Sequence, residues 1–372
     1  MSLAQHTWRA LPKGRTVVVS DVHGDPDAFG ALLRQLAFTP RECLVILGDL
    51  TEKGPDSLGL LRCVMALGEK QPVLALRGNC DDAVCELVRI AHGQPAYWLQ
   101  NLPRYLRHQG RSIIGEMMAT CGLAPEDAAD LERVARTLYA AFRKEMDYLA
   151  ALPDIIETDA FLFVHAGLRP GDATRQSRRD CLLFKAFGEW AEANHVHFEK
   201  PCVVGHWPTC NYHHTQHSYA PVIGRGTGVI SIDGGHQVKP GAMLHALIIE
   251  DGRAEGLRFA SYDPMPAMRA VDAQPGFPAQ PLTLTWLDRF VQPLCDEGEN
   301  VLCRHLKTGR KLWVPRRHLS RQGGRWAAPD CTNDHLPLAA GSVVHLLEEG
   351  PLGALVRRGT RAGWYGGRLE PL

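Results

Sequence analysis

Five short polar clusters, each beside an apolar β-like run, constrain the fold of this 372-residue chain more than any other feature. The apolar runs cover residues 16–19, 44–47, 73–76, 161–164 and 202–204. In open α/β sheets, ligands bind at the carboxyl ends of the strands. We therefore expect the clusters to converge at one edge: Ser20-Asp21-Val22-His23-Gly24, Gly48-Asp49, Arg77-Gly78-Asn79-Cys80-Asp81, Val164-His165-Ala166-Gly167 and Val204-Gly205-His206-Trp207-Pro208.

Helical patterns separate the first three runs. Asp25-Pro26 is a typical helix start, and the residues Phe29, Leu32, Leu33 and Leu36 then form the apolar stripe of a helix packed on a sheet. Residues 58–67 predict a second helix, so the order is β-α-β-α-β and indicates a layered α/β domain. Residues 83–150 are predicted to form a mainly helical insertion within a first domain of residues 1–262.

The composition and periodicity of the sequence change after residue 262. Residues 263–283 are rich in proline and lack periodicity, which predicts a linker. Residues 284–372 contain short β-like runs broken by Gly and Pro, which predicts an all-β accessory region. Trp313-Val314-Pro315 before Leu319 and Trp364-Tyr365 before Leu369 suggest an internal repeat. Two SH3-like barrels in tandem fit this repeat, and a single irregular β domain is the alternative.

Charge and cysteine content exclude several classes of protein. Lys plus Arg and Asp plus Glu are equal at 41 each, which excludes a globally basic nucleic-acid coat and an acidic disordered tail. No apolar run approaches the roughly 18 residues of a membrane span, and the first residues lack the apolar segment of a signal peptide. The 11 cysteines form no CxxC pair. We expect a cytoplasmic protein with reduced thiols and no membrane partner.

The five clusters combine carboxylate, amide and imidazole groups. Each cluster alone is typical of a turn, a capped helix or a core histidine. Together, at one sheet edge, they form the mixed oxygen and nitrogen set that two divalent transition metals sharing a carboxylate require.

Further blocks connect this pattern to a known family. They are His165-Ala166-Gly167-Leu168-Arg169-Pro170-Gly171, Gln176 with Asp180-Cys181-Leu182-Leu183, and Ser231-Ile232-Asp233-Gly234-Gly235. Residues 14–255 resemble the calcineurin-like metallophosphoesterase superfamily, and within it the bacterial serine/threonine phosphoprotein phosphatase-like branch. The resemblance implies a four-layer α/β/β/α sandwich.

The resemblance also implies a site with two divalent metals, of which Mn, Fe and Zn all suit the ligands. Asp21 and His23 would bind the first metal, Asp49 would bridge both, and the second would be completed by Asn79, His165 and His206. The metals would activate a bridging hydroxide for attack on phosphorus. Arg77 matches the family arginine that holds phosphate oxygens.

Several positions depart from the family pattern. Cys80 replaces the histidine that is the candidate general acid, and Glu52-Lys53 replaces the Asp-Arg pair that orients this acid and binds phosphate. Lys185 likewise stands where an arginine is frequent. General acid help is typically worth about 10²- to 10⁴-fold, so we expect weaker hydrolysis of esters with poor leaving groups. One histidine of His213-His214-Thr215-Gln216-His217 is a candidate substitute acid, and a polar surface loop is the alternative interpretation.

Three functions follow from these patterns. The leading prediction is metal-dependent hydrolysis of phosphomonoesters, with phosphorylated protein or a small phosphoester as substrate. The first rival is a nucleotide phosphodiesterase or dinucleoside polyphosphate hydrolase. Gly-Asn-Cys-Asp favours the phosphodiesterase-like branches, whereas Pro208 replaces the second histidine of their Gly-His-x-His motif. Trp207 would test for base stacking in this rival.

The second rival is a phosphatase-like binding module with little turnover, acting through the C-terminal region. The basic segment of residues 304–325 contains no acidic residue, so it is a candidate surface for an anionic partner. A solvated face of a barrel is the alternative interpretation of that segment.

Overall fold

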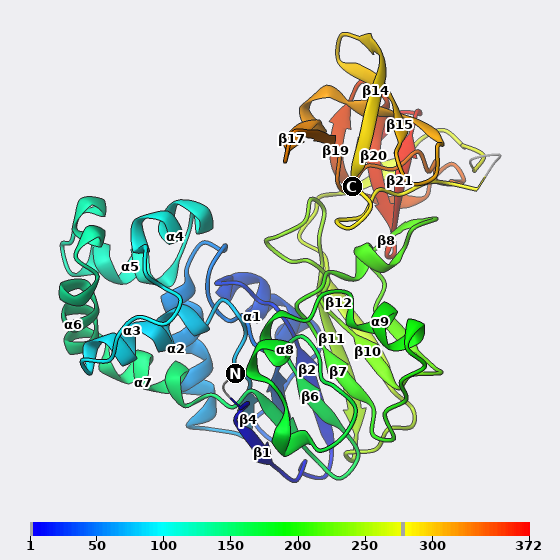
Figure 1. Cartoon of the computed structure of the whole chain (residues 1–372). Helices are drawn as coiled ribbons and strands as arrows, with labels where there is room; N and C mark the ends of the chain where they lie inside the picture. The colour runs from blue at the N-terminus through cyan, green and yellow to red at the C-terminus, as the bar shows by residue number, and fades with distance from the viewer. Residues whose placement is uncertain (1–2, 277–279) are drawn as a thin grey trace. The chain divides into compact units, whose positions relative to one another are not determined.

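Figure 1 presents the chain as a computed structural model, which describes residues 3–276 and 280–372. The chain divides into two compact units. The first holds the chain up to Trp207 with Pro221–Val238 and Leu244–Tyr262, and the second holds Pro208–Ala220, Lys239–Met243 and Asp263–Leu372. Two short segments that we predicted within the first domain therefore belong to the second unit.

Several helices of the first unit, such as α1, begin at a residue whose side chain caps the helix. Asp25 accepts a hydrogen bond from the amide of Ala28 at 2.9 Å, and Pro26 occupies the first helical position. No helix in the described part of the chain is long and apolar enough to cross a bilayer. The α-helices are α1 (Pro26–Gln35), α2 (Ser57–Gly68), α3 (Asp82–Ala91), α4 (Leu102–Gln109), α5 (Ile113–Thr120), α6 (Leu131–Ala141), α7 (Arg143–Ala151), α8 (Arg178–Leu183) and α9 (Phe187–Ala193).

Two sheets form the centre of the first unit. The six-stranded sheet has the order β1 (His6–Trp8), β5 (Ile155–Glu157), β6 (Leu162–Val164), β7 (Cys202–Val204), β10 (Val229–Ser231) and β9 (Val222–Gly224). The five-stranded sheet has the order β12 (Arg258–Tyr262), β11 (Leu244–Glu250), β2 (Arg15–Val19), β3 (Cys43–Ile46) and β4 (Val73–Ala75). Strands β2, β3 and β4 run parallel, and so do β6, β7 and β10.

Alternate residues of the central strands pack into different cores. Val17 and Val19 of β2 join the core that contains residues of α1 and α2, whereas Val18 packs between the sheets with Phe163 of β6. Val204 of β7 joins a third core with residues of α9. Successive side chains of a strand point to opposite faces, so a strand that is covered on both sides needs apolar residues at successive positions. The result is four layers in the order α/β/β/α, which confirms the predicted sandwich.

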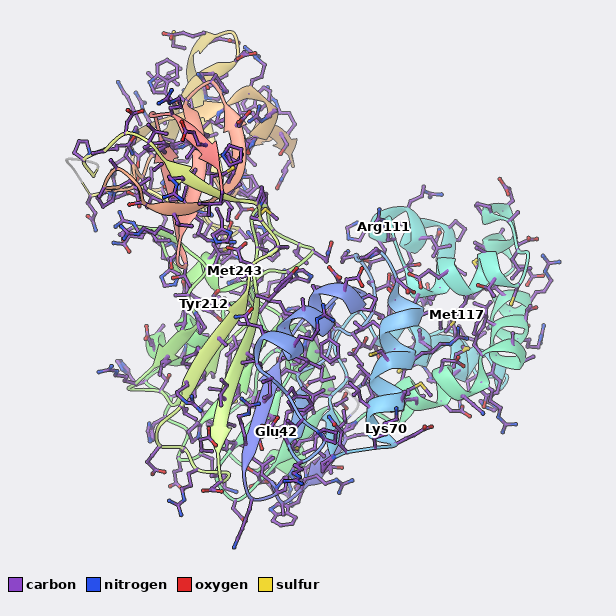
Figure 2. All side chains as sticks on the ribbon, turned by 180° about the vertical axis from the view of Figure 1, so that it is seen from behind. Glu42, Lys70, Arg111, Met117, Tyr212 and Met243 are labelled. Atoms are coloured by element: carbon purple, nitrogen blue, oxygen red, sulfur yellow. The ribbon has the colours of Figure 1, made fainter. Side chains whose placement is uncertain are left out.

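Helices α3 to α7 form the cyan to green group in Figure 1. Met117 of α5, labelled in Figure 2, is fully buried together with Leu138 of α6 and Met146 of α7. The amide of Lys53 donates a hydrogen bond of 3.1 Å to the carbonyl of Arg111, the residue labelled between α4 and α5. This helical insertion therefore supports a loop that carries predicted site residues.

The second unit is built from antiparallel strands. One sheet has the order β22 (Leu369–Pro371), β13 (Ala267–Ala270), β19 (Val343–Gly350), β20 (Gly353–Arg358), β21 (Arg361–Tyr365) and β8 (His217–Ser218). The other has the order β16 (Lys311–Pro315), β15 (Asn300–His305), β14 (Phe290–Glu297), β18 (Arg325–Ala327) and β17 (Ser320–Gln322). Each sheet has its own small apolar core. The C-terminal region is strand-rich as expected, and its likeness to SH3 barrels stays a prediction.

The predicted linker contains a strand of this second unit. Strand β13 lies within residues 263–283, and its Met268 pairs with Val344 of β19 and with Pro371 of β22. The expectation of a segment without regular structure is therefore wrong for residues 267–270. The reason for this difference is that both partner strands lie far along the chain, so no local sequence pattern marks the pairing. Residues 277–279 of the predicted linker lie outside the described residues.

Candidate metal centre

The six predicted metal ligands lie at one edge of the two sheets of the first unit. In one sheet Asp21 and His23 follow β2, Asp49 follows β3 and Asn79 follows β4, and in the other His165 follows β6 and His206 follows β7. A continuous chain of short distances connects all six. The placement is the convergence expected at the carboxyl ends of parallel strands.

His23 faces two carboxylates on one side of this cluster. Its Nε2 lies 3.9 Å from Oδ1 of Asp21 and 3.7 Å from Oδ2 of Asp49. Its Nδ1 lies 3.3 Å from the carbonyl oxygen of Thr51, which orients the ring. Such separations are long for hydrogen bonds and suit donor atoms that share a cation.

His165 forms the other side of the cluster. Its Nδ1 lies 2.8 Å from the carbonyl oxygen of Leu47, so its Nε2 is directed into the site. There Nε2 lies 3.5 Å from Oδ1 of Asp49 and 3.0 Å from Oδ1 of Asn79. The ring of His206 packs edge to face against that of His165, with centroids 5.0 Å apart. Asp49 thus presents one oxygen to each side.

Burial shifts the pKa values of these groups toward their uncharged forms. It raises the pKa of Asp49 to about 8, with a further contribution from the charge of Asp81. Burial also lowers the pKa of His23 to about 3 and that of His165 to about 4. The imidazoles are therefore neutral at pH 7 and offer a lone pair, and a divalent cation would stabilise the charged carboxylates. The donor set fits two divalent metals.

The backbone of the cluster is held in an unusual conformation. Four of the six residues have left-handed backbone angles: Asp21 (φ 52°), His23 (φ 50°), Asp49 (φ 51°) and His206 (φ 64°). Such conformations cost free energy in non-glycine residues and gather at functional sites. The loops also need glycine, because a Cβ on Gly205 would lie 2.2 Å from Oδ2 of Asp21.

Arg77, the predicted phosphate clamp, is placed differently from the expectation. Its side chain is buried, with Nη1 3.3 Å from Oδ1 of Asp154 and Nη2 donating a 2.8 Å hydrogen bond to the carbonyl of Ala150. The guanidinium therefore connects β4 to the segment before β5. A buried arginine with these partners serves the packing of the sheets rather than an open phosphate site.

Cys80 lies inside the site but carries no negative charge at neutral pH. Its Sγ belongs with His23 and Asp49 to a group of donor atoms that all lie within 4.8 Å of one another. Burial, together with the charge of Asp49, raises the pKa of the thiol well above its usual range. The amide of Cys80 donates a 2.8 Å hydrogen bond to Oδ1 of Asp49. Its backbone therefore positions the shared carboxylate, while its thiol is a poor nucleophile.

Glu52 and Lys53 are held by the helical insertion. Both have left-handed backbone angles, with φ of 73° and 68°. Burial raises the pKa of the Glu52 carboxyl well above its usual range. The ammonium of Lys53 donates a hydrogen bond to Oε1 of Gln109 in α4. Lys53 therefore has a protein partner at the position where the resemblance implies phosphate binding.

The three histidines weighed as substitute acids belong to the second unit. His217 is buried, with Nε2 3.1 Å from the hydroxyl of Tyr219, and Nδ1 of His214 lies 3.6 Å from Oδ2 of Asp288. His213 lies in the same short segment, Pro208–Ala220. All three thus belong to the second unit, and none is among the candidate metal-binding groups found in the described residues.

Two further predicted residues, Lys185 and Trp207, lie in the first unit. Lys185 is exposed, and its charge is one of the causes that lower the pKa of His206, after burial and the neighbouring His165. Lys185 therefore lies near the metal cluster. Trp207, in contrast, is only 5% exposed, which does not suit an open stacking platform for a base.

The basic segment of residues 304–325 is partly neutralised. Lys307, Arg316 and Arg317 form ion pairs with carboxylates of the second unit. The guanidinium of Arg321 lies 4.3 Å above the ring centre of Trp326. An anionic partner for this surface stays a prediction.

Asp81 orders two of the site loops, although the sequence suggested no role for it. Its Oδ2 accepts a 2.9 Å hydrogen bond from the amide of Gly78, and its Oδ1 accepts bonds from the amide and hydroxyl of Thr51 at 3.1 and 3.0 Å. Asp81 thus ties the loop of Asn79 to the loop of Asp49. The turn residues around it were a local signal that could have indicated this role.

His236 follows β10 at the same sheet edge, and the sequence analysis missed it. Its Nε2 lies 2.9 Å from Oδ2 of Asp25, which also accepts a 2.7 Å hydrogen bond from Gln237. These bonds hold the loop after β10 against the start of α1. No local pattern marks the pair, because 211 positions separate the two residues.

Comparison with known proteins identifies the pattern. The calcineurin-like phosphoesterase family matches residues 14–240, more than half of the chain. The asymmetrical bis(5′-nucleosyl)-tetraphosphatase PrpE of Bacillus subtilis is 27% identical over 181 residues, which cover 45% of this chain and 64% of that protein. The match thus spans less than two thirds of that relative's length.

Two further matches extend over more of the compared proteins. A symmetrical bis(5′-nucleosyl)-tetraphosphatase of Glaesserella parasuis is 28% identical over 233 residues, which cover 52% of this chain and 83% of that protein. Among solved structures, a metallophosphoesterase from Sphaerobacter thermophilus has a TM-score of 0.39 at 18% identity, covering 68% of this chain and 89% of that one.

Proposed function

Because the chain belongs to the calcineurin-like phosphoesterase family, we propose that its site hydrolyses phosphoric esters and anhydrides with two divalent cations. The placement of Asp49 carries this proposal. One oxygen of Asp49 lies 3.7 Å from Nε2 of His23, and the other lies 3.5 Å from Nε2 of His165. A carboxylate between two such groups supports the proposal that Asp49 would be shared by two cations.

The chain's own residues fix the geometry of this centre. Two bound cations would supply Lewis acidity and activation of water. The hydroxyl of Ser20 donates a hydrogen bond to Oδ2 of Asp21, and the amide of His206 donates another at 3.0 Å. These bonds orient the carboxylate before any ion binds. Imidazole, carboxylate and amide donors suit Mn, Fe and Zn, and we propose manganese for the first tests.

The acid side of the site limits which leaving groups the enzyme can expel. A buried thiol stands at Cys80 and a buried carboxyl at Glu52, where the family pattern has a histidine and an aspartate, so the imidazole acid of the pattern is absent. An anhydride releases a phosphate anion that needs little protonation, whereas an ester of serine releases a basic alkoxide. We therefore propose phosphoanhydrides of nucleotides, such as dinucleoside polyphosphates, as the substrate class. The names of the two tetraphosphatase relatives support this choice.

Phosphorylated protein, the leading prediction from the sequence, becomes the second candidate. The retained ligand set supports it, because the same two-metal chemistry acts on monoesters. The missing acid argues that turnover would be slow. A binding module with little turnover is the outcome expected if the changes at Cys80, Glu52 and Lys53 abolish catalysis.

Comparison of four substrates tests this proposal. Manganese-loaded protein would be assayed with diadenosine tetraphosphate, p-nitrophenyl phosphate, its bis-diester and a phosphoserine peptide. Asp49→Asn is the inactive variant, and Asp27→Asn is the matched control, because Asp27 is an exposed acid in α1. We expect the tetraphosphate to be hydrolysed with the highest kcat/KM.

Each result has a defined meaning. Faster turnover of the phosphoserine peptide would favour the phosphoprotein candidate, and faster turnover of the diester would favour phosphodiesterase chemistry. Turnover of all four at the level of Asp49→Asn, with metal bound, would overturn the enzyme proposal in favour of a binding module.

A further inference from the structure

A positively charged pocket of about 460 Å³ lies beside α8. Three cationic side chains and one carboxylate contribute to its lining, which comprises Arg169, Ser177, Arg179, Asp180, Leu183, Phe184 and Lys185. The positive charges outnumber the negative one, so the pocket attracts anions. We refer to these residues as the α8 pocket.

Arg169 is held rigidly at one wall of this pocket. Its Nε donates a 3.0 Å hydrogen bond to Oδ2 of Asp180, and its guanidinium stacks over the rings of Phe184 at 4.4 Å and Trp190 at 4.7 Å. The ion pair uses Nε, so the terminal nitrogens of the fork are the donors that a phosphate would meet. A stacked arginine loses little further freedom when it binds a planar or tetrahedral anion.

The α8 pocket is built onto the loop that carries His165. The amide of Ala166 donates a 2.7 Å hydrogen bond to the carbonyl of Cys181 in α8. Gly167 packs so closely that a Cβ there would lie 3.0 Å from Cβ of Phe184. Arg169 follows His165 by four positions in this loop. The metal ligand and the pocket wall therefore form one packed segment.

Lys185 contributes a third cation to the α8 pocket. It directly follows Phe184, against which Gly167 of the His165 loop packs. Within the pocket, Arg179 offers a second guanidinium on α8.

We propose that the α8 pocket binds a second phosphate group of the substrate, next to the phosphoryl group that reacts at the metals. This inference rests on the proposed function, and it assigns the site that would select substrates with more than one phosphate group. Arginine forms two parallel hydrogen bonds to phosphate, which makes it suited to a polyphosphate chain. A single phosphate would gain nothing from this pocket, and a chain of phosphates would gain affinity.

Inhibition of p-nitrophenyl phosphate turnover by two anions tests the pocket. Tripolyphosphate probes a phosphate chain, and inorganic phosphate probes a single group at the metals. We expect tripolyphosphate to have the lower inhibition constant in the natural protein. Arg179→Ala and Arg169→Ala should raise the constant for tripolyphosphate by about tenfold or more, which is typical for the loss of a charge-assisted hydrogen bond, and change that for phosphate far less.

Arg175→Ala is the matched control, because its side chain is 84% exposed and lies outside the α8 pocket. We expect this variant to behave as the natural protein does. Equal inhibition constants for the two anions, or equal losses in the arginine variants and in Arg175→Ala, would overturn the pocket proposal. Those results require an active enzyme, so they differ from a failure of the proposed function, in which p-nitrophenyl phosphate itself would not be hydrolysed.

Discussion

The metal cluster of the first unit and an ion pair of the second unit arrange buried charged groups in opposite ways. In the first unit, the carboxyl groups of Asp21 and Asp49 are buried beside each other, and their mutual repulsion adds to burial in raising the pKa of Asp21. In the second unit, the ammonium of Lys239 pairs with Asp330 and lies 3.9 Å over the ring of Trp286. There the charges are balanced within the protein.

This difference shows what each arrangement contributes. A buried pair of opposite charges fixes local geometry, and loss of one partner leaves an unpaired charge. A buried group of like charges destabilises the fold until a cation binds, which is the expected trade between stability and function at an active site. The metal cluster and the ion pair therefore predict opposite responses when a buried carboxylate is neutralised.

Among the variants that test this comparison, Asp49→Asn should have the largest effect on activity. We expect metal-dependent turnover to fall by about a thousandfold or more, because the shared ligand is lost. The melting temperature of the metal-free protein should rise, because a buried carboxyl whose ionisation is disfavoured by burial is replaced by a neutral amide. Calorimetry with and without a chelator measures this shift. A lower melting temperature of the metal-free variant would contradict the comparison.

Asp334→Asn tests the paired arrangement of the second unit. Asp334 is fully buried and lies 2.8 and 2.9 Å from two nitrogens of Arg361. We expect the free energy of unfolding to fall by about 2 kcal/mol, less than for a fully buried pair, because the Arg361 side chain is 32% exposed.

Denaturation curves measure that loss, and Asp296→Asn is its matched control. The pair of Asp296 and Arg316 is more than half exposed, so its loss should have little effect. Manganese affinity should stay unchanged in both variants. An Asp334→Asn protein as stable as the control would show that the buried pair contributes nothing.

The metal affinity of the first unit should increase with pH. Because the pKa of Asp49 is about 8 in the metal-free protein, an ion must displace its proton at lower pH. We expect affinity to rise roughly tenfold per pH unit between pH 6.5 and 8, and to level off above. Calorimetric titration with manganese measures this slope. A flat profile would show that Asp49 is already ionised.

The same pKa shifts set the stability of the metal-free protein. The raised pKa of Asp49 stabilises the fold at low pH, and this contribution is lost as the pH rises from about 4 through about 8. The lowered pKa of His23 acts oppositely: its contribution is present above pH 6.5 and is lost as the pH falls to about 3.

Cys80→Ala should have the smallest effect. The thiol is uncharged, so we expect turnover of p-nitrophenyl phosphate to change by no more than about threefold. Cys80→Ser is the matched control that keeps a polar atom at this position. Loss of bound metal in Cys80→Ala, measured by elemental analysis, would instead identify the thiol as a ligand near His23.

Local sequence was sufficient for the residues that cluster at the sheet edge. Asp21, Asp49 and His206 lie within three positions of a strand end, and the strand pairing brings such positions together. The burial of β2 and β7 on both faces likewise follows from their apolar runs. A layered α/β domain and its ligand edge could therefore be predicted from the residues, whereas the four-layer sandwich was predicted from the resemblance to the metallophosphoesterases.

Partners distant in the chain account for the differences. The role of Arg77 depends on Asp154, which lies 77 positions away, and the pair of His236 and Asp25 spans 211 positions. Strand β13 pairs with strands at the far end of the chain. Sequence periodicity gives no information on such distant contacts. We therefore predicted a phosphate clamp at Arg77 and a linker at residues 263–283, where the structure has an ion pair and strand β13.

The left-handed backbone of four predicted ligands affects how the protein would acquire its ions. These residues are Asp21, His23, Asp49 and His206. A cage whose loops are already fixed has no folding step to complete when an ion enters or leaves. Exchange of one divalent metal for another would then proceed without rebuilding the protein. The relative abundance of these metals in the surrounding medium, weighted by their intrinsic affinities, would decide which one the enzyme carries.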